Sequence, residues 1–424
     1  MAEQIHKKFT DAQVKDLINR YLLGELQRQH IQEVLSIGQT RFFALLKKYQ
    51  KNPQDFSIAY HRSRKTRAID PKIEKNIIKE LEITKKFIDN KDMPIWTYNY
   101  SFIKNDLENR YHQKVSVPTI IQRAKEHGFY IPRSKKIKTH DHEVITNNVG
   151  ELLQHDSSYH LFSPYAQQKW WLLTSLDDFS RMILYSILVM RDIAWPHIVA
   201  IQKIFLTFGL PLSMYVDQDS IFRFVKGRDY YHYKQHHLQT DDSTPQWKQV
   251  VNDCQVKVIY ALSAPAKGKI ERPYRWLQDH IVRICARENI SSLAKANEIL
   301  FREVHEYNYK RVHSTTGEIP FLRYQRALKE KRSVFRNFFI PPPYKTTKDI
   351  FCFRADRTVD SYRCVSINNQ RIKFNHAPIR ETVNLRIHPD DQSGLSEVRF
   401  WHKDQLLDVQ FIKTHLLGLS TFKL

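Results

Sequence analysis

Residues 152–159 read Leu-Leu-Gln-His-Asp-Ser-Ser-Tyr, and residues 212–217 read Leu-Ser-Met-Tyr-Val-Asp. Each stretch is an apolar, strand-like run that leads to an acid, Asp156 in the first and Asp217 in the second. The apolar residues pull these acids towards the protein core, where an unpaired carboxylate is costly. A bound metal ion would offset that cost, so both aspartates are candidate metal ligands.

A third acid, Glu271, lies in Ala-Lys-Gly-Lys-Ile-Glu-Arg-Pro-Tyr-Arg-Trp at 266–276, a pattern typical of a loop entering a helix. The intervals are 217 − 156 = 61 and 271 − 217 = 54 positions, and these numbers alone do not prove that the acids converge. Two strand-end carboxylates and one helical carboxylate can hold two divalent ions about 3.5–4 Å apart against a phosphodiester. Such hard oxygen ligands favour Mg²⁺, for which Mn²⁺ is expected to substitute.

Basic and polar residues surround Glu271. Arg275 and Gln278, four and seven residues further on, share its predicted helix face, and Lys267 and Lys269 precede it. These four residues are candidates for holding a DNA backbone beside the metals. For Arg275 an ordinary solvated helix face is an equally open interpretation.

The chain is strongly basic. It has 424 residues, 67 Lys and Arg against 45 Asp and Glu, and a formal net charge of +22. Such an excess favours a polyanion, above all double-stranded DNA, over a merely soluble protein or one that binds an acidic membrane surface. The length predicts several domains.

The sequence indicates a reducing, non-membrane setting. The four cysteines include no C-x-x-C pair, which argues against a disulfide framework and a cysteine zinc site. The N-terminus lacks the apolar core of a signal peptide, and no run of about 18 apolar residues predicts a membrane span. We therefore expect a reducing compartment, such as the cytoplasm, and no membrane partner.

Residues 1–52 predict a helix-turn-helix DNA-binding domain. Thr10-Asp11-Ala12-Gln13 has the form of a capping box, and helical apolar spacing follows on both sides of Gly38. A plain three-helix bundle remains the alternative. The predicted DNA-reading side chains are Gln39, Arg41, Lys47 and Lys48.

Residues 53–69 predict a basic linker. It is either a solvated connector or an arm that tracks the DNA backbone or minor groove. Its candidate DNA contacts are Arg62, Arg64, Lys65 and Arg67.

A second helix-turn-helix-like DNA-binding domain is predicted over 70–139. Asp70-Pro71 is an N-cap followed by proline, and Ser116 precedes the last helix, which ends near Gly128. The candidate DNA contacts on that helix are Thr119, Gln122, Arg123 and Lys125.

From residue 148 the periodicity becomes strand-like. Three apolar runs up to Val189 predict a meander, and helices are expected from Pro196 to Phe208, from Gly268 to Arg287 and over 292–309. The segment 222–249 is interpreted as an insertion. It would contact DNA or a second protomer, and the sequence does not choose between them.

Residues 329–347 predict a proline-stiffened linker, and 348–424 a small β-barrel. Apolar side chains are expected to share strand faces at 383, 385 and 387, at 398 and 400, and at 407, 409 and 411. Asn368-Asn369 and Lys403-Asp404 are turn candidates. A positive surface for nonspecific DNA binding is expected from Arg371, Lys373, Arg380, Arg386 and Arg399, with a purely structural cap as the alternative.

The quoted motifs resemble those of D-D-E transposases and retroviral-type integrases. The matching stretches are 154–159, 176–181, 216–222, 266–276 and Tyr-Asn-Tyr-Lys-Arg-Val-His-Ser at 307–314. The resemblance covers about 148–328 and implies a ribonuclease H-like α/β catalytic core with a mixed sheet, inside a multidomain α+β protein. It also implies that Asp156, Asp217 and Glu271 form the catalytic, metal-binding triad.

Two departures from the family pattern matter. Gln218-Asp219 stand where many relatives carry Asn-Gly, so Asp219 is an alternative ligand, although Asp217 ends the strand. The interval from Asp217 to Glu271 is longer than in compact relatives, which agrees with an insertion at 222–249. Asp177 and Asp178 match a family motif but are interpreted as structural, through turn hydrogen bonds or contact with Arg181.

The resemblance further implies an insertion-sequence transposase that binds the ends of a mobile element. It would catalyse two-metal strand cleavage and strand transfer into target DNA, as a homo-oligomer of two or more copies. A helper ATPase is left open as a partner. The alternatives are a metal-dependent nuclease that cuts without joining and a catalytically lapsed, transposase-derived DNA-binding protein.

Overall fold

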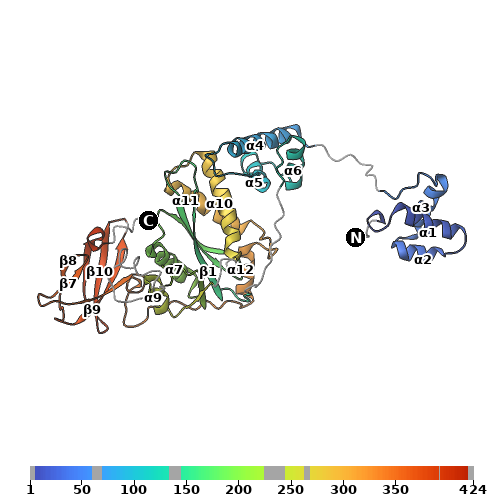
Figure 1. Cartoon of the computed structure of the whole chain (residues 1–424). Coiled ribbons are helices and arrows are strands. Elements are labelled where there is room, and N and C mark those ends of the chain that lie inside the picture. Colours follow the sequence, from blue (N-terminus) through green and yellow to red (C-terminus); the bar gives the residue numbers. More distant parts are fainter. Residues whose placement is uncertain are drawn as a thin grey trace. The chain divides into compact units, whose positions relative to one another are not determined.

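The computed structural model describes residues 5–59, 69–132, 145–223, 244–261, 268–390 and 392–418, with only the backbone for 268–272. The chain divides into two compact units, Met1–Glu74 and Lys75–Leu424, which are considered separately below. Figure 1 shows the elements of both units.

The first unit is built on three helices, α1 (Asp11–Leu22), α2 (Arg28–Leu35) and α3 (Gln39–Lys51), preceded by the short 3-10 helix η1 (Ile5–Lys7). The predicted capping box is present, because Gln13 N donates to Thr10 Oγ1 at 3.3 Å and Thr10 N donates to Gln13 Oε1 at 2.9 Å. The three helices enclose a core of Val14, Ile18, Ile31, Leu35 and Phe42. The helices lie where the sequence predicts them, and their function as a helix-turn-helix stays a prediction.

Three more helices follow, α4 (Pro71–Asp89), α5 (Tyr100–Tyr111) and α6 (Val117–Glu126). Their starts follow local cap chemistry: Lys72 N donates to Asp70 Oδ1 at 2.8 Å, and Thr119 N donates to Ser116 Oγ at 3.3 Å. The helices again match the prediction, whereas their DNA-reading role is untested.

The larger unit contains a five-stranded sheet in the order β3-β2-β1-β4-β5. Its strands are β1 (Leu152–His160), β2 (Trp170–Asp177), β3 (Ile183–Val189), β4 (Ser213–Val216) and β5 (Lys257–Tyr260). The first three form the predicted antiparallel meander, while β4 runs parallel to β1 and β5 parallel to β4. The mixed sheet expected from the family resemblance is therefore confirmed, and it supports a ribonuclease H-like core.

Helices cover both faces of this sheet (Figure 1). On one face α7 (Ala194–Phe208) and α9 (Gln246–Asp253) pack against Leu153, Met214 and Val216. On the other, α10 (Gly268–Glu288) and α11 (Leu293–Tyr309) pack against Leu172 and Leu176. The helix α12 (Pro320–Lys329) then leads towards the C-terminal strands.

The C-terminal strands form a four-stranded sheet in the order β11-β10-β9-β6 and a separate two-stranded ribbon. They are β6 (Phe353–Thr358), β7 (Cys364–Ile367), β8 (Gln370–Lys373), β9 (Thr382–Asp390), β10 (Leu395–His402) and β11 (Gln405–Lys413), flanked by α13 (Thr347–Ile350) and η3 (Thr414–Leu417). Among the described residues no strand pairing joins β6 to β11, so the sheet is open and the predicted closed barrel is not observed.

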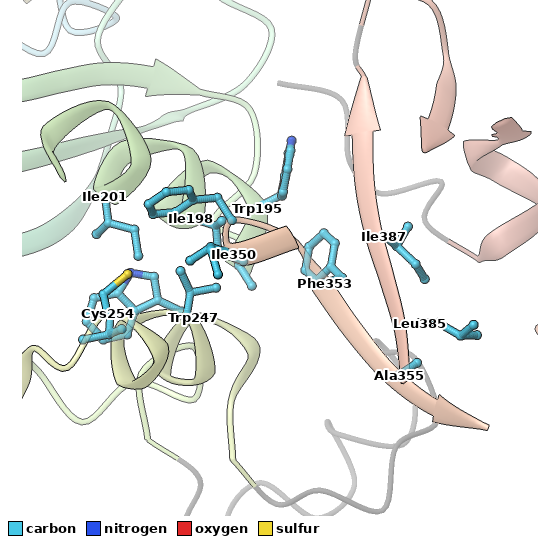
Figure 2. Close-up of a cluster of buried hydrophobic side chains, with 14 of the residues drawn as sticks. Trp195, Ile198, Ile201, Trp247, Cys254, Ile350, Phe353, Ala355, Leu385 and Ile387 are labelled. Atoms are coloured by element: carbon cyan, nitrogen blue, oxygen red, sulfur yellow. The ribbon is translucent and has the colours of Figure 1, made fainter. Parts of the chain in front are cut away.

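The open sheet and the core share one hydrophobic cluster (Figure 2). Trp195 and Ile198 of α7 and Trp247 of α9 share a single hydrophobic cluster with Phe353 and Leu385. The predicted inward face of β9 is confirmed, since Val383, Leu385 and Ile387 are fully buried. On this face Phe400, the β10 partner of Leu385, stacks on Phe374 at 4.3 Å, so the face is buried within the C-terminal domain itself. The opposite face meets α9, where Arg386 contacts Asp253.

The predicted face of β11 holds only in part. Val409 and Phe411 pair with Arg399 and Glu397 and share one face, but Leu407 is not on it. Phe411 is 66% exposed, whereas Ile412 packs against the core cluster. The pairing jumps from Phe400↔Asp408 to Trp401↔Leu406, so Leu407 is an extra residue, and a β-bulge exchanges the faces of the residues that follow.

Two of the arginines expected on a positive surface are instead buried. Arg386 and Arg399 are only 5% and 7% exposed. Arg399 Nε donates to Asp349 Oδ1 at 2.5 Å, and Arg386 stacks on the Tyr344 ring at 3.9 Å. The buried acid Asp349 therefore explains the placement of Arg399, and the aromatic contact that of Arg386.

Candidate active site

The parallel register of β1 and β4, continued two residues past its last pair, would set Asp156 opposite Asp217. Leu152 pairs with Ser213 and Gln154 with Tyr215, a constant offset of 61 positions. Asp156 and Asp217 each lie two residues beyond the Gln154–Tyr215 pair, so the same offset relates them. Neighbouring strands lie about 4.8 Å apart, and residues opposite each other point to the same face. The 61 positions between Asp156 and Asp217, which carry no information in the sequence, thus equal the offset between paired residues of β1 and β4.

Alternation along β1 separates its side chains between the two helical layers. His155 faces α7, because its Nε2 lies 2.7 Å from Nδ1 of His197. Ser158 faces α10, because its Oγ accepts from Gln278 Nε2 at 2.7 Å. Asp156 precedes Ser158 by two residues, so both side chains point to the same face. Asp156 therefore lies on the face covered by α10, the helix that contains Glu271.

Tyr274 joins α10 to the strand at this point. Its hydroxyl donates to the main-chain carbonyl of Asp156. Burial and then the charge of Asp156 raise the pKa of Tyr274 well above its ordinary value, and the charges of Asp192 and Asp217 act in the same direction. One side chain of α10 thus lies within electrostatic reach of three carboxylates.

The loop after β4 is fixed by its own side chains. Asp217 Oδ1 accepts from Asp219 N at 3.0 Å, and Asp219 Oδ1 accepts from Ile221 N at 3.0 Å. Gln218 Nε2 donates to the carbonyl of Ala261 at 3.1 Å, which ties this loop to the end of β5. Asp219 is exposed and Asp217 half-buried. The register of Asp217 with Asp156 makes it the better ligand candidate.

The third acid is located only through its backbone. Glu271 is the fourth residue of α10, and its side chain lies outside the described residues. Lys267 and the side chain of Lys269 also lie outside them. Among the side chains that the structure describes, no group of three or more His, Cys, Asp or Glu could hold a metal ion. This absence says nothing about Glu271, because its side chain is not among those described.

The two remaining candidates on α10 differ in their surroundings. Arg275 is exposed, whereas Gln278 is half-buried and holds α10 against β1 through Ser158. The amide of Gln278 therefore has a structural partner in this state.

The predicted DNA-contact residues of the helical regions are mostly at the surface. Gln39, Arg41, Lys47 and Lys48 are exposed on α3, and Lys48 Nζ donates to the carbonyl of Ser57 at 2.5 Å. The linker candidates lie outside the described residues: Arg62, Arg64, Lys65 and Arg67.

On α6, local contacts engage all four candidates. Gln122 and Arg123 bond to Glu126 at 2.9 and 2.7 Å, and Lys125 Nζ lies 4.9 Å from the centre of the Tyr130 ring. Thr119 Oγ1 lies 2.8 Å from the hydroxyl oxygen of Ser116. These contacts would have to rearrange if the residues bound DNA.

The acids of the family motif at 176–181 have structural partners. Asp177 accepts from Gly150 N at 2.9 Å and from the Ser180 hydroxyl at 2.6 Å. Asp178 accepts from Gln154 Nε2 at 2.6 Å and from Arg181 at 3.2 Å. These bonds agree with the structural interpretation of both acids.

Sequence reasoning missed Tyr274 and Asp192. Tyr274 stands in the quoted 266–276 motif, three residues after Glu271, so helical spacing alone could have singled it out. Asp192 follows β3 in a stretch without any recognisable local pattern, and only the tertiary structure brings it to Ser157, whose hydroxyl lies 2.7 Å away.

Sequence comparison links the chain to transposases. It is 25% identical over 260 residues to "Putative transposase y4bF" of Sinorhizobium fredii, covering 61% of this chain and 51% of that protein. It is 24% identical over 235 residues to the transposase for insertion sequence IS1202 of Streptococcus pneumoniae, covering 55% and 44%. These matches confirm the transposase resemblance. The chain spans about half the length of the curated relatives it matches. No family model matches it.

Solved structures give a weaker likeness. The catalytic core domain of BIV integrase aligns with 43% of this chain and 98% of its own at 12% identity and a TM-score of 0.30. The HTLV-2 integrase catalytic core domain in complex with magnesium aligns with 41% and 96% at 14% identity and a TM-score of 0.30. These scores are too low to carry an argument. Separately, none of the described helices has the length and apolar character that crossing a bilayer requires.

Proposed function

We propose that this chain, a relative of bacterial transposases, is a metal-dependent DNA transposase of the D-D-E integrase type. It would bind the ends of a mobile element, cleave a strand there and join the resulting 3′-hydroxyl to target DNA. The observation that supports this best is the β1–β4 register, which, if continued by two residues, would bring Asp156 and Asp217 together beneath α10.

The donor set fits divalent metal ions. Asp156 and Asp217 offer hard carboxylate oxygens on one face of the sheet, and Mg²⁺ prefers such ligands, with Mn²⁺ as the expected substitute. Glu271 precedes Tyr274 by three residues in α10, and residues three apart share a helix face. When bound, two ions there would activate the attacking hydroxyl and stabilise the leaving oxygen.

The neighbouring residues would keep this site in place. Tyr274 holds the main chain at Asp156, and its raised pKa keeps the hydroxyl protonated as a hydrogen-bond donor. Gln218 holds the Asp217 loop to the end of β5. Asp156 would thus be presented from the middle of β1 and Asp217 from the residue after β4, both held in place, which suits a reaction that requires fixed geometry.

DNA binding is part of the same proposal. The net charge of +22 favours phosphate contacts, and the basic side chains singled out on α3, on α6 and in the linker would supply them. The division into two DNA-reading domains, a catalytic core and a C-terminal domain is proposed with it. Joining two element ends would require at least two copies of the chain, in the cytoplasm at the nucleoid. A helper ATPase is left open.

The test is a strand-joining assay. The full-length protein is incubated with labelled DNA from the flanks of its own gene and with Mg²⁺ or Mn²⁺. Joined products support the proposal, cut but unjoined ends identify a nuclease, and a shifted but intact duplex identifies a binding protein.

Variants of the three acids test whether each one is required for strand joining. Asp156→Asn, Asp217→Asn and Glu271→Gln should each abolish joining while leaving DNA binding largely intact. Asp219→Asn is the matched control from the same loop as Asp217, and it should retain joining. Wild-type joining by any of the first three variants would remove that residue from the site.

A further inference from the structure

Two buried histidines and the half-buried Asp192 are linked on the α7 face of the sheet, behind Asp156. Nε2 of His155 lies 2.7 Å from Nδ1 of His197, and Nε2 of His197 lies 2.7 Å from Oδ1 of Asp192. The second oxygen of Asp192 accepts from the Ser157 hydroxyl at 2.7 Å. His155 and Ser157 are the two sequence neighbours of Asp156, so the chain of bonds returns to β1 on the other side of the acid.

The hydrogen-bond roles along this chain are mutually consistent. The carboxylate of Asp192 can only accept, so Nε2 of His197 donates to it. Nδ1 of a neutral His197 then accepts from Nε2 of His155. Nδ1 of His155 in turn accepts from the hydroxyl of Ser175, 2.7 Å away on β2. Both histidines are satisfied as neutral rings, and the path is anchored on β1, β2 and α7.

Aromatic rings enclose the two histidines. His155 stacks on Trp247 with an interplanar angle of 8°, and the edge of Phe222 contacts both imidazoles at centroid distances of 5.7 and 5.1 Å. Both histidines are completely buried. A broken bond here could not be replaced readily by solvent, so each partner strongly constrains the next.

We infer that Asp192 and His197 are positioning residues for Asp156, an inference that rests on the proposed function. They fix the side chains before and after the acid on one face of β1, while Tyr274 fixes its main-chain carbonyl from α10 on the other. With both neighbours held, the backbone at Asp156 cannot rotate freely, and its carboxylate keeps one direction towards the α10 face. The pair would thereby set metal affinity without touching the metal.

Binding of Mn²⁺ to the full-length protein, followed by electron paramagnetic resonance, tests the inference without relying on catalysis. Asp156→Asn should lose the site. Ser157→Ala and Asp192→Asn should weaken Mn²⁺ binding about 10- to 100-fold, the usual effect of removing a group that orients a metal ligand. Ser157→Thr keeps the hydroxyl and should bind nearly as the wild type does.

Ser213→Ala is the matched control. Ser213 is a strand serine on β4 whose hydroxyl donates to the Glu151 carbonyl at 2.8 Å, away from Asp156. Loss of this hydroxyl should leave Mn²⁺ affinity unchanged. Thermal unfolding of every variant shows whether their stabilities are comparable. Ser157→Ala removes one oxygen from a half-buried position, so it remains informative even if Asp192→Asn fails to fold.

The outcomes separate the two proposals. If the wild type does not bind Mn²⁺, or if Asp156→Asn binds it equally well, the proposed function fails and the positioning role falls with it. If Asp156→Asn loses the site while Ser157→Ala retains wild-type affinity, only the positioning role is overturned. Equal weakening by Ser157→Ala and Ser213→Ala would also overturn it, because the effect would then be general.

Discussion

Arg287 is expected to hold the helices α4 and α5 onto α10. Its guanidinium donates to Glu80 at 2.5 and 2.7 Å and to Asp106 at 2.5 Å. The side chains of Arg287, Glu80 and Asp106 are only 13%, 1% and 12% exposed. Arg287→Met would leave the buried Glu80 without its cation and Asp106 with Arg110 alone, 3.3 Å away, and breaking such a cluster costs about 3–5 kcal/mol.

Hydrogen exchange of the α5 amides measures this cost locally. A loss of about 3–5 kcal/mol corresponds to exchange roughly 10²- to 10³·⁵-fold faster where opening of this contact controls exchange. Lys104→Met is the control on the same helix, since the Lys104–Glu108 pair is exposed and 4.0 Å apart. Its effect should stay within about 0.5 kcal/mol.

The stability lost in Arg287→Met should depend on pH in a definite direction. Burial alone would raise the pKa of Glu80, but the hydrogen bonds from Arg287 and Tyr111 hold it below its ordinary value of 4.5. This group therefore stabilises the wild type above pH 4.5, and that contribution is lost as the pH falls through the lowered pKa. In Arg287→Met burial dominates, the pKa of Glu80 rises, and protonation relieves the buried charge. The difference in stability between Arg287→Met and the wild type should therefore become smaller at acid pH.

A second substitution completes the test. Adding Glu80→Gln to Arg287→Met removes one of the stranded charges, so the double variant should recover part of the lost stability. Exchange at α5 that is unchanged in Arg287→Met, or equally fast in Lys104→Met, would refute the assignment of Arg287 as the main tie between these helices.

Three further perturbations test the fold. Thr10→Ala should destabilise the first unit by about 1 kcal/mol in urea unfolding, because it removes the cap of α1, and unchanged stability would show that the capping box is dispensable. Phe353→Ala should cost about 3–5 kcal/mol, since the side chain is 2% exposed in the cluster shared by the core and the C-terminal sheet; a cost below about 1 kcal/mol would contradict that packing. Burial raises the pKa of Asp177 from 3.8 to about 6, so the folded state binds this proton more tightly than the unfolded chain does. The stability of the wild type relative to Asp177→Asn should therefore rise as the pH falls from 7 to 4, by up to about 3 kcal/mol, and a difference that does not change with pH would refute the raised pKa.

The features that the sequence predicted well are local. Thr10, Asp70 and Ser116 cap helices because a side-chain oxygen lies near backbone amides two or three residues away. The turn at Asn368-Asn369 needs two positive φ angles, which asparagine tolerates, and the structure has 45° and 60° there. Such signals are contained in a few consecutive residues.

The features that the sequence could not supply depend on tertiary pairing. The β1–β4 register gives the interval between Asp156 and Asp217 its meaning only after both strands are placed. The bulge at Leu407 takes this residue off the face that Val409 and Phe411 share, and the composition of β11 carries no sign of it. Asp192 enters the site from a loop through Ser157 and His197, contacts between residues 35 and 5 positions apart in the chain.

The central claim is that Asp156, Asp217 and Glu271 surround common metal ions. Fe²⁺ bound in place of Mg²⁺ reduces added hydrogen peroxide to hydroxide and a hydroxyl radical and is itself oxidised to Fe³⁺. The radical cuts the nearby backbone, so the cut positions map the metal site directly. We predict cuts near residues 156, 217 and 271 that excess Mg²⁺ suppresses and that Asp156→Asn abolishes together. Cuts that miss the β1 or β4 position, or that persist unchanged in Asp156→Asn, would contradict the shared site.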